Sequence, residues 1–306
     1  MRVLIVGRGA TGLLYGAWLH KGGADVTLLS RSPVVASDQP IALVSEQGEE
    51  VISGVRSCTL GDLEGNFDAI IFMVKHYDLL DAAQKTASFL RPSGCAIGLQ
   101  NGVSSWDTLN SVFEADRLCV GSVYLAATKE DDFRVSFAGK KNHIVLGSYA
   151  NGVHPVADAL ADTWREAGVS VTTYADVRIE LWMKFLGFAT NAALTCLARL
   201  PAGTIYHEAN RLSLAERSID EIISVANAEG LTLPDDAKAR TVSLLQSFPP
   251  EMVASMRKDL DAGRRLELDV VSGRIVGLAK KHDLQVPLHE IAFACLEPFA
   301  AGRKPH

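Results

Sequence analysis

The stretch that decides the fold is residues 1–26, MRVLIVGRGATGLLYGAWLHKGGADV. Its apolar residues 3–6 predict a buried strand that runs directly into a glycine-rich turn, and a helical stretch and a second strand at 25–29 follow. This order of strand, G-x-G-x-x-G turn, helix and strand is typical of a βαβ unit that binds a dinucleotide. The turn residues predicted to hold the cofactor are Gly7, Arg8, Gly9, Ala10, Thr11 and Gly12.

Each glycine of this turn has a physical role in such a unit. Gly7 permits the tight turn from strand to helix, Gly9 leaves room for a pyrophosphate against the backbone, and Gly12 lets the helix pack closely on the strand. The helix that follows points its free N–H groups and the positive end of its dipole at the phosphates. A glycine-rich turn that binds no ligand is the alternative.

The end of the second strand indicates which dinucleotide is bound. NAD-binding units usually place an acidic residue there, about twenty residues beyond the glycines, to hold the ribose 2′-hydroxyl. Here the strand ends in Leu28-Leu29-Ser30-Arg31-Ser32, without an acid. Because Arg31 can pair with a 2′-phosphate through two parallel hydrogen bonds, we predict NADP(H) as the cofactor. A solvated loop arginine is the alternative.

Length and composition are those of an ordinary two-domain enzyme. The chain has 306 residues, 48% of them hydrophobic, and its formal net charge of −6 argues against nucleic acid as a partner. No apolar run approaches the roughly 18 residues of a membrane span, and because a core strand is predicted so near residue 1 we expect no signal peptide. Five cysteines without C-x-x-C spacing and eight histidines without metal-site spacing predict a cytoplasmic protein with reduced thiols and no metal.

Two regions of different texture divide the chain. Residues 1–176 alternate short apolar strands with helical stretches, which predicts a doubly wound α/β domain of the Rossmann type, whereas residues 177–306 predict an all-α domain. Residues 133–138 and 143–148 look like a hairpin, which would end the sheet in an antiparallel extension. Strands are expected at 2–6, 25–29, 41–45, 50–55, 68–74, 95–99, 118–127, 133–138, 143–148 and 169–173. Helices are expected at 177–199, 208–229, 234–247, 250–261, 265–282 and 288–299. So long an apolar helical domain also suggests a homodimer.

Two polar motifs follow strands of the predicted sheet. Lys75 comes after the strand at 68–74, and Asn101, in Gln100-Asn101-Gly102, follows the strand at 95–99. The carboxyl ends of the strands in a doubly wound sheet face the ligand crevice, which would place both side chains near the cofactor. The alternatives are an exposed lysine at the start of a loop and an asparagine that serves the Asn-Gly turn alone.

Lys184 is the most unusual residue of the helical region. It is the only charged residue between Leu181 and Leu197. A lysine buried in such a helix loses solvation, its pKa falls, and it is usually functional or tightly paired. Asn191 lies seven residues further on and returns to the same helix face. Snorkelling of the Lys184 amine to the surface is the alternative.

Taken together, these motifs resemble the ketopantoate reductase (2-dehydropantoate 2-reductase) family over nearly the whole chain. The resemblance implies a Rossmann domain, a helical domain like that of 6-phosphogluconate dehydrogenase, and an active site in the cleft between them. The matching motifs are the N-terminal glycine turn, Val74-Lys75, Gln100-Asn101-Gly102, Trp182-x-Lys184, Pro201-x-Gly203, Ser255-Met256-x-x-Asp259, and Glu267-x-Asp269 with Gly273.

The resemblance also assigns cofactor contacts to individual residues. It implies that Arg31 is the basic residue at the 2′-phosphate of NADP(H), and that Ala126 touches the cofactor through its backbone. Lys75, Asn101 and Glu267 match positions around the nicotinamide end.

For catalysis the resemblance implies reduction of a 2-keto acid to a 2-hydroxy acid, with Lys184 as the general acid. Glu267 and Asn101 complete the catalytic group, Glu267 by orienting the lysine or the cofactor and Asn101 by fixing the geometry. Ser255 matches a ligand of the substrate carboxylate. By spacing alone, the charged cluster that contains Ser255 and Glu267 would be a solvated face.

The sequence departs from the family at one important place. Well-studied members carry asparagines four and eight residues after the lysine, and these hold the substrate, but this chain has Phe188 and Ala192 there. Asn191 falls between them and is expected to compensate in part as a substrate ligand. Because polar groups that grip a substrate hydroxyl are lost, the substrate is 2-dehydropantoate or a related, more apolar 2-keto acid. A 3-hydroxyacid or polyol-phosphate dehydrogenase and a non-catalytic NADP(H)-sensing protein are the alternative functions.

Overall fold

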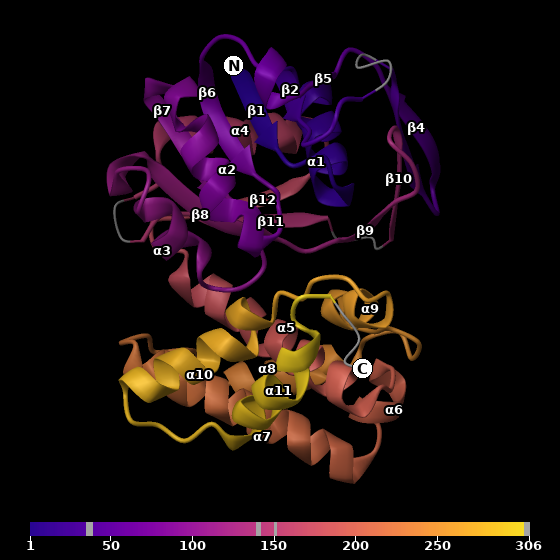
Figure 1. Cartoon of the computed structure of the whole chain (residues 1–306), viewed down its shortest axis with the longest axis vertical. Coiled ribbons are helices and arrows are strands. Elements are labelled where there is room, and N and C mark those ends of the chain that lie inside the picture. Colours follow the sequence, from indigo (N-terminus) through magenta and orange to yellow (C-terminus); the bar gives the residue numbers. More distant parts are fainter. Residues whose placement is uncertain (35–38, 139–141, 150–151, 303–306) are drawn as a thin grey trace. The chain divides into compact units, whose positions relative to one another are not determined.

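The computed structural model describes residues 1–34, 39–138, 142–149 and 152–302, and the chain forms two compact units (Figure 1). Unit 1 comprises Met1–Gln100 and Ser105–Val177, and unit 2 comprises Asn101–Ser104 and Arg178–His306. The sequence places the division between residues 176 and 177. In the structure the second unit begins one residue later and also takes in the short segment 101–104.

Unit 1 is built on an eight-stranded sheet in the order β12-β11-β8-β7-β6-β1-β2-β5. The strands from β8 to β5 are parallel, β11 runs antiparallel to β8, and β12 runs parallel to β11. Because β2 and β6 flank β1 on opposite sides, the strand order reverses at β1, which is where open α/β sheets bind their ligands. The bounds are β1 (Arg2–Val6), β2 (Asp25–Leu29), β5 (Arg56–Cys58), β6 (Phe67–Phe72), β7 (Leu90–Gly98), β8 (Leu118–Val123), β11 (His143–Gly147) and β12 (Ser170–Tyr174).

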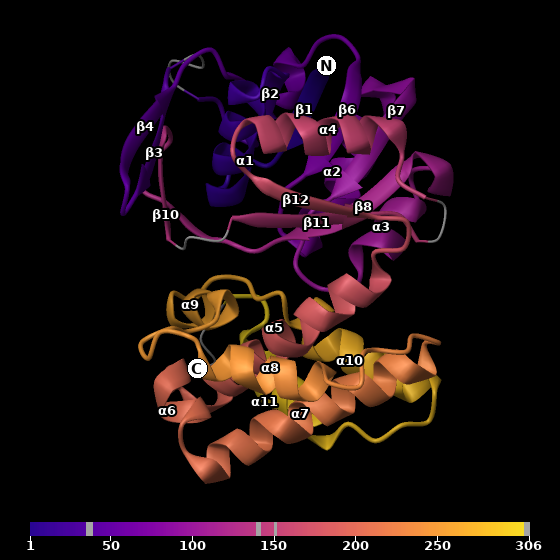
Figure 2. The ribbon, with the colours of Figure 1, turned by 180° about the vertical axis from the view of Figure 1, so that it is seen from behind.

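Helices cover both faces of this sheet, as Figures 1 and 2 show from opposite sides. One face carries α2 and α3, which pack on each other, and the other carries α1 and α4. The core beneath α4 is anchored by Trp164, which is fully buried and donates from its indole nitrogen to the carbonyl of Tyr15 at 3.1 Å. The predicted doubly wound fold is therefore confirmed. The helical bounds are α1 (Ala10–Lys21), α2 (Leu79–Thr86), α3 (Ser105–Asn110) and α4 (Pro155–Glu166), with 3-10 turns η1 (Leu60–Asp62), η2 (His76–Asp78), η3 (Ala87–Phe89) and η4 (Ala115–Arg117).

Unit 1 also contains a second sheet, which the sequence pattern does not indicate. Its strands, in the order β4-β3-β10-β9, are β3 (Ile41–Ser45), β4 (Gly48–Ile52), β9 (Ala126–Lys129) and β10 (Arg134–Ala138). The expected hairpin of 133–138 with 143–148 is wrong, because β10 pairs with β3 and β9 whereas β11 pairs with β8 and β12. Packing gives the reason: Phe137 of β10 meets Trp18 of α1 edge-on, with ring centroids 5.2 Å apart. The expected antiparallel extension is present, but β11 and β12 form it.

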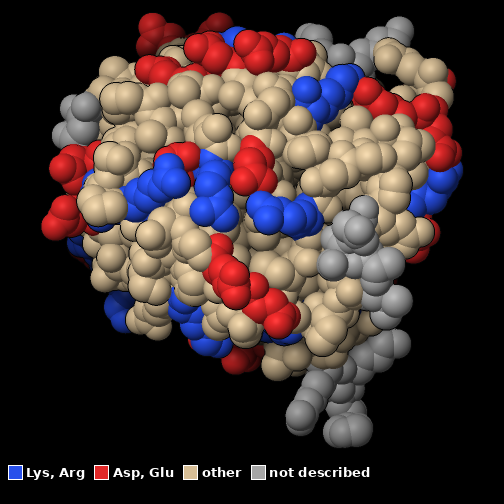
Figure 3. All heavy atoms as spheres, turned by 90° about the horizontal axis from the view of Figure 1, so that it is seen from above, with Lys and Arg blue, Asp and Glu red and all other residues tan. Residues whose placement is uncertain are grey.

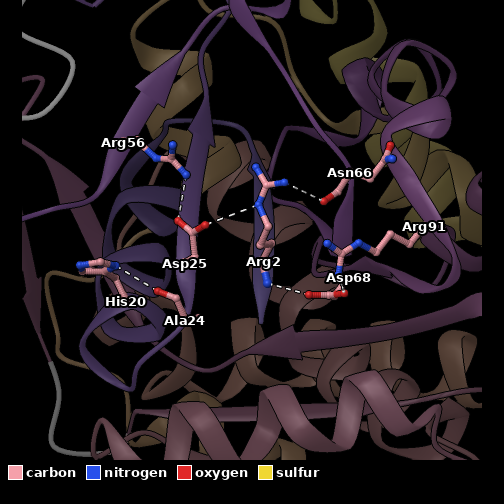
Figure 4. Close-up of polar contacts among 8 residues, drawn as sticks. All are labelled: Arg2, His20, Ala24, Asp25, Arg56, Asn66, Asp68 and Arg91. Carbon is pink, nitrogen blue, oxygen red and sulfur yellow. Dashed lines mark hydrogen bonds and ion pairs between the residues drawn. The ribbon is translucent and has the colours of Figure 1, made fainter.

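The amino ends of the parallel strands carry a row of alternating charges (Figure 4). Arg56 on β5 pairs with Asp25 on β2 at 2.9 Å, and Asp25 lies 3.5 Å from Nε of Arg2 on β1. The backbone N–H of Arg2 donates to Asp68 on β6 at 2.7 Å, and Asp68 also pairs with Arg91 on β7. Seen from above, acidic and basic residues are interspersed rather than gathered into a field of one sign (Figure 3).

Unit 2 is helical, and its described residues, 101–104 and 178–302, contain no strand. Helix α5 is its centre and packs against α6, α7, α8, α9 and α11. The short helix α6 stands where the sequence shows only proline and glycine punctuation. The bounds are α5 (Arg178–Ala198), α6 (Ala202–Tyr206), α7 (Ala209–Ala228), α8 (Ala237–Gln246), α9 (Ser255–Asp261), α10 (Ser272–Lys281) and α11 (Pro287–Leu296), with η5 (Leu268–Val270) and η6 (Glu297–Phe299).

Helix α5 corrects the expectation that no apolar run approaches the length of a membrane span. By length and composition alone it could cross a bilayer, and it is the one such helix among the described residues. However, 72% of its apolar window is buried inside the protein, as in the core helix of a globular unit.

A buried polar network ties α5 to its neighbours. Thr190 on α5 and Ser218 on α7 share a hydrogen bond of 2.8 Å, and Ser218 lies 3.0 Å from Nε2 of His289 on α11. The other ring nitrogen of His289 lies 3.3 Å from the hydroxyl of Ser272 on α10. All four residues are fully buried, and burial lowers the pKa of His289 to about 4.

Candidate functional site

The glycine turn after β1 is the first part of the candidate site. Gly7 has a φ of +115°, and a Cβ there would lie 2.9 Å from backbone atoms of Met73 and Val74. A Cβ on Gly12 would lie 1.8 Å from the carbonyl oxygen of Gly7, so both positions require glycine. By contrast, a Cβ on the exposed Gly9 would meet no atom of the described residues within 4 Å, which leaves open space in front of the turn.

The first turn of α1 fits a phosphate group. Gly9 is the N-cap residue of α1, and no side chain there accepts a hydrogen bond from the first helical N–H groups. The first turn of α1 contains no acidic residue. The predicted cofactor residues Ala10 and Thr11 lie in that turn and are partly exposed. Free helical N–H groups at the positive end of the dipole, next to open space, are the features that hold the pyrophosphate of a dinucleotide.

Arg8 is built into its surroundings by its side chain, which is only 3% exposed. Its Nε donates to Ser57 Oγ on β5 at 3.1 Å, and Nη1 donates to Asp132 at 3.3 Å. The guanidinium carbon lies 4.7 Å from the ring centroid of Phe133. Nη2 is buried and finds no hydrogen-bond partner among the described residues. Burial lowers the pKa of Arg8, and the Asp132 carboxylate opposes that shift.

Arg31 follows β2, as predicted, and its side chain is 79% exposed. Its Nη2 donates to the carboxylate of Asp78, in η2 after β6, at 2.7 Å. The structure therefore leaves this guanidinium open to a ligand while giving it an acidic neighbour. The spacing of residues along the chain does not predict that Arg31 pairs with Asp78, because the fold of the sheet, and not the local sequence, brings these two residues together.

Lys75 and the segment around Asn101 follow β6 and β7, which are adjacent and parallel. Lys75 is half-buried and immediately precedes η2. The side-chain amide of Gln100 donates to the carbonyl of Phe72 at 2.8 Å and to that of Val74 at 3.3 Å. Gln100 thus holds the carboxyl ends of the two strands together, a role that sequence reasoning missed although the Gln-Asn-Gly motif drew attention to it.

Lys184 and Asn101 meet in unit 2, although they lie far apart in the sequence. The Lys184 ammonium donates to Oδ1 of Asn101 at 2.9 Å. Asn101 stands in a turn that continues through Gly102, whose φ is +96°. Loss of solvation lowers the pKa of the Lys184 ammonium to about 7. The lysine is therefore a proton donor that can give up its proton near neutral pH.

The remaining predicted site residues occupy exposed or half-buried positions at the ends of elements. Ser255 is the exposed first residue of α9, and half-buried Glu267 immediately precedes η5 in the same unit. Ala126 is the exposed first residue of β9 in unit 1. The glycine turn, Arg31, Lys75 and Ala126 belong to unit 1, whereas Lys184, Asn101, Ser255 and Glu267 belong to unit 2.

Asn191, the predicted substrate ligand, has its side-chain oxygen engaged inside unit 2. Its side-chain oxygen accepts a hydrogen bond of 2.9 Å from the hydroxyl of Tyr206, which is fully buried. The pattern of the helix places Asn191 on the face of Lys184, and α6, which packs against α5, bonds the Asn191 oxygen through Tyr206. Phe188 is half-buried, with its ring centroid 6.5 Å from that of Phe185, and Ala192 is fully buried.

No group of three or more histidine, cysteine, aspartate or glutamate side chains is arranged to hold a metal ion within the described part of the chain. All five cysteines are described, and each is a free thiol. Unit 1 thus offers a glycine turn suited to an anion, and unit 2 offers a desolvated lysine with its amide partner.

A Rossmann-type unit joined to a helical unit that carries such a lysine is the architecture of a class of dinucleotide-dependent oxidoreductases. Comparison with known families identifies the class more closely. Residues 3–151 match the model of ketopantoate reductase PanE/ApbA, and residues 176–300 match the model of its C-terminal domain. The chain belongs to the ketopantoate reductase PanE/ApbA family and is an oxidoreductase that acts on CH–OH groups.

Individual relatives agree with this assignment. A 2-dehydropantoate 2-reductase of Halobacterium salinarum is 27% identical over 293 residues, which cover 94% of this chain and 95% of that protein. The crystal structure of a PanE/ApbA family ketopantoate reductase from Ralstonia eutropha JMP134 is 28% identical, with a TM-score of 0.85 and 98% of each chain covered. A dimeric ketopantoate reductase from Staphylococcus aureus shares the fold, with a TM-score of 0.83 at 22% identity over 98% of this chain and 99% of that one.

Proposed function

We propose that this protein reduces a 2-keto acid to the corresponding 2-hydroxy acid with NADPH, and that the substrate is 2-dehydropantoate or a related 2-keto acid. The observation that carries the proposal is the Lys184 ammonium, with its pKa lowered to about 7 and its hydrogen bond of 2.9 Å to Asn101. A donor whose pKa lies near the working pH is well suited to general acid catalysis.

In this mechanism Lys184 stabilises the negative charge that develops on the keto oxygen and then protonates it. Asn101 is a positioning residue, because its amide oxygen accepts one N–H of the ammonium and so restricts where the others point. Glu267 orients the lysine or the nicotinamide end of the cofactor. Ser255 binds the substrate carboxylate.

NADP(H) fits the residues that unit 1 offers. The open space at Gly9 and the uncapped start of α1 suit the pyrophosphate, and the exposed Arg31 guanidinium suits the 2′-phosphate. Lys75 and the backbone of Ala126 would contact the cofactor further along. When bound, NADPH supplies the hydride.

The composition of α5 bears on which 2-keto acid is reduced. Phe188 lies one turn after Lys184, and the side-chain oxygen of Asn191 already accepts a hydrogen bond from Tyr206. Ala192 offers no polar group. Since Phe188 and Ala192 supply no polar group for a substrate hydroxyl and the Asn191 oxygen already has a partner, we expect an apolar 2-keto acid to be reduced at least as well as 2-dehydropantoate.

The test is oxidation of NADPH, followed by its absorbance, with 2-dehydropantoate and with 2-keto acids that carry branched or aromatic side chains. Lys184→Ala is expected to lower turnover by about 10²-fold or more while leaving the Kd for NADPH little changed. Lys238→Ala is the matched control, because Lys238 is an exposed lysine of the same unit that pairs with Asp220. Near wild-type turnover of Lys184→Ala with the best substrate would refute the proposed role.

The same panel separates the other functions that fit this architecture. Turnover of 3-hydroxyacids or polyol phosphates, but of no 2-keto acid, would identify a dehydrogenase of that kind. Binding of NADPH without turnover of any substrate would identify a sensor.

We also propose that the protein is a cytoplasmic homodimer. The free thiols support the compartment, and the dimeric relative from Staphylococcus aureus supports the assembly. Exposed apolar side chains in unit 2, such as Ile291 at 57% and Leu244 at 46%, are candidates for the interface. Light scattering across a range of protein concentrations tests the oligomeric state, and a constant monomer mass would contradict it.

A further inference from the structure

Arg8 is held at a particular place on the sheet. It follows β1 by two residues, and its Nε reaches Ser57 on β5. Because β2 lies between β1 and β5, the Arg8 side chain passes over the carboxyl end of β2. In a dinucleotide-binding unit the end of this strand is where the 2′ substituent of the adenosine ribose is recognised.

The charges around Arg8 comprise a second cation, Lys129, and two carboxylates, Asp131 and Asp132. Asp132, which accepts from Nη1 of Arg8, also pairs with Lys129 at 2.7 Å. Asp131 also attracts the Arg8 guanidinium electrostatically, and Asp132 itself is 59% exposed. Within the part of the chain that the structure describes, the buried Nη2 has no acceptor, which is costly for a charged donor and favours any anion that reaches it.

We propose that Arg8 is a second ligand of the 2′-phosphate of NADP(H), through Nη2, and so helps to set the preference for NADP(H) over NAD(H). The inference rests on the proposed function only for the identity of the cofactor. The fingerprint motif by itself assigns the backbone of this residue to the pyrophosphate, whereas here the side chain has its own role.

The β9–β10 turn, residues 130–133, controls access to Nη2. It carries Phe133, over which the guanidinium stacks, and the exposed residues Asp131 and Asp132. Since Nη2 is closed to solvent, the turn must move aside for the 2′-phosphate to reach it. After this movement Asp132 loses Arg8 but keeps its ion pair with Lys129. Asp132 therefore competes with the phosphate for Arg8.

The test measures binding by calorimetry, without turnover, and uses 2′,5′-ADP and 5′-AMP as probes that differ in the 2′-phosphate. The quantity compared is the ratio of the Kd for 5′-AMP to the Kd for 2′,5′-ADP. Arg8→Met, which retains an apolar side chain over Phe133, is expected to lower this ratio by about tenfold. Arg8→Lys keeps the charge but loses the planar fork, and is expected to lower the ratio by a smaller factor.

Arg2→Met is the matched control. Arg2 stands at the opposite end of β1, its guanidinium carbon lies 5.2 Å from the ring centroid of Phe67, and it is also paired with an aspartate, Asp25. The ratio of the two Kd values for Arg2→Met is expected to equal that of the wild type. If Arg8→Met does not fold, Asp132→Asn takes its place, and the expected result is a higher ratio because the competing charge is removed.

The outcomes separate this inference from the proposed function. A wild-type protein that binds both probes equally would contradict the NADP(H) preference itself. A wild-type preference for 2′,5′-ADP that survives both Arg8 substitutions, or that Asp132→Asn leaves unchanged, overturns the role of Arg8 alone. Equal weakening of both probes by Arg8→Met also overturns it, because Arg8 would then act on a part of the nucleotide common to both.

Discussion

The pH dependence of reduction should report the protonation state of Lys184. With a pKa of about 7, the ammonium is half protonated at neutral pH. At pH 9 about 1% of it keeps its proton, whereas an ordinary lysine would remain almost fully protonated. If this group is the general acid, the rate of keto acid reduction should fall roughly fiftyfold between pH 7 and pH 9.

Substitution of Asn101 should move this limb of the profile. Its amide oxygen accepts from the ammonium and therefore favours the charged form. A hydrogen bond to a charged group contributes about 1.5–3 kcal/mol, so Asn101→Ala should lower the pKa by about one unit or more. Asn101→Asp places a negative charge beside the ammonium and should move the limb to higher pH.

The assay is kcat/KM for the best 2-keto acid from pH 6 to 10, together with the reverse oxidation of its 2-hydroxy acid. Oxidation needs the neutral amine as a base, so its rate should rise through the pH range in which reduction falls, and this excludes simple inactivation. Asn110→Ala, an exposed asparagine at the end of α3, is the matched control and should leave both profiles unchanged. A reduction rate that stays level up to pH 9, or a profile indifferent to both Asn101 variants, would refute the reasoning.

Three further predictions concern the glycine turn, the buried polar network of unit 2 and the row of alternating charges in unit 1. Gly9→Ala should keep the wild-type Tm but weaken NADPH binding. Gly12→Ala places a methyl group 1.8 Å from a backbone oxygen and should lower the free energy of unfolding by about 1–3 kcal/mol or more. Equal Tm values for the two variants would contradict this prediction. In the folded protein the pKa of His289 is depressed to about 4, so the unfolded chain binds the proton first as pH falls below the ordinary value of about 6.5. The wild type should therefore lose about 3 kcal/mol of stability by pH 4. In urea titrations His289→Gln should lack that loss, and parallel curves would disprove the assignment. Burial tends to raise the pKa of Asp68, but the hydrogen bonds from Arg2 and Arg91 outweigh this effect and lower it. Asp68→Asn should therefore cost about 1 kcal/mol of stability at neutral pH, and its difference from wild type should vanish as pH falls through the depressed pKa. A difference that persists in acid would count against the ion pairs.

The sequence predicts the local elements of the fold better than the way in which they pair. Residues 2–6 and 25–29 are strands with the predicted bounds, because apolar runs next to a glycine turn leave little choice. The partner of residues 134–138 is decided by β3, some ninety residues earlier in the chain, and by the ring of Trp18. Such long-range packing has no signature in the local pattern, and the nearby segment 143–148 looked like a sufficient partner.

The same limit applies to the candidate site. Lys184 could be singled out because it is the one charge in a long apolar run, and the structure gives it the lowered pKa that this isolation predicts. Asn191 could not be assigned from helical periodicity alone, because the pattern shows which face a residue occupies but not that Tyr206 packs against it. The acidic neighbours Asp78 and Asp132 of the two arginines come from distant elements and were equally invisible.

The segment after β7 shows how one short motif serves both units. Gln100 belongs to unit 1 and holds the carboxyl ends of β6 and β7 together through two hydrogen bonds to backbone carbonyls. Asn101, the next residue, belongs to unit 2 and accepts a hydrogen bond from the Lys184 ammonium. A single peptide bond therefore leads from the edge of the sheet to the partner of Lys184. Insertion of one glycine between these two residues should leave each unit folded yet impair reduction far more than NADPH binding. If both properties survived the insertion, the direct linkage would have no part in catalysis.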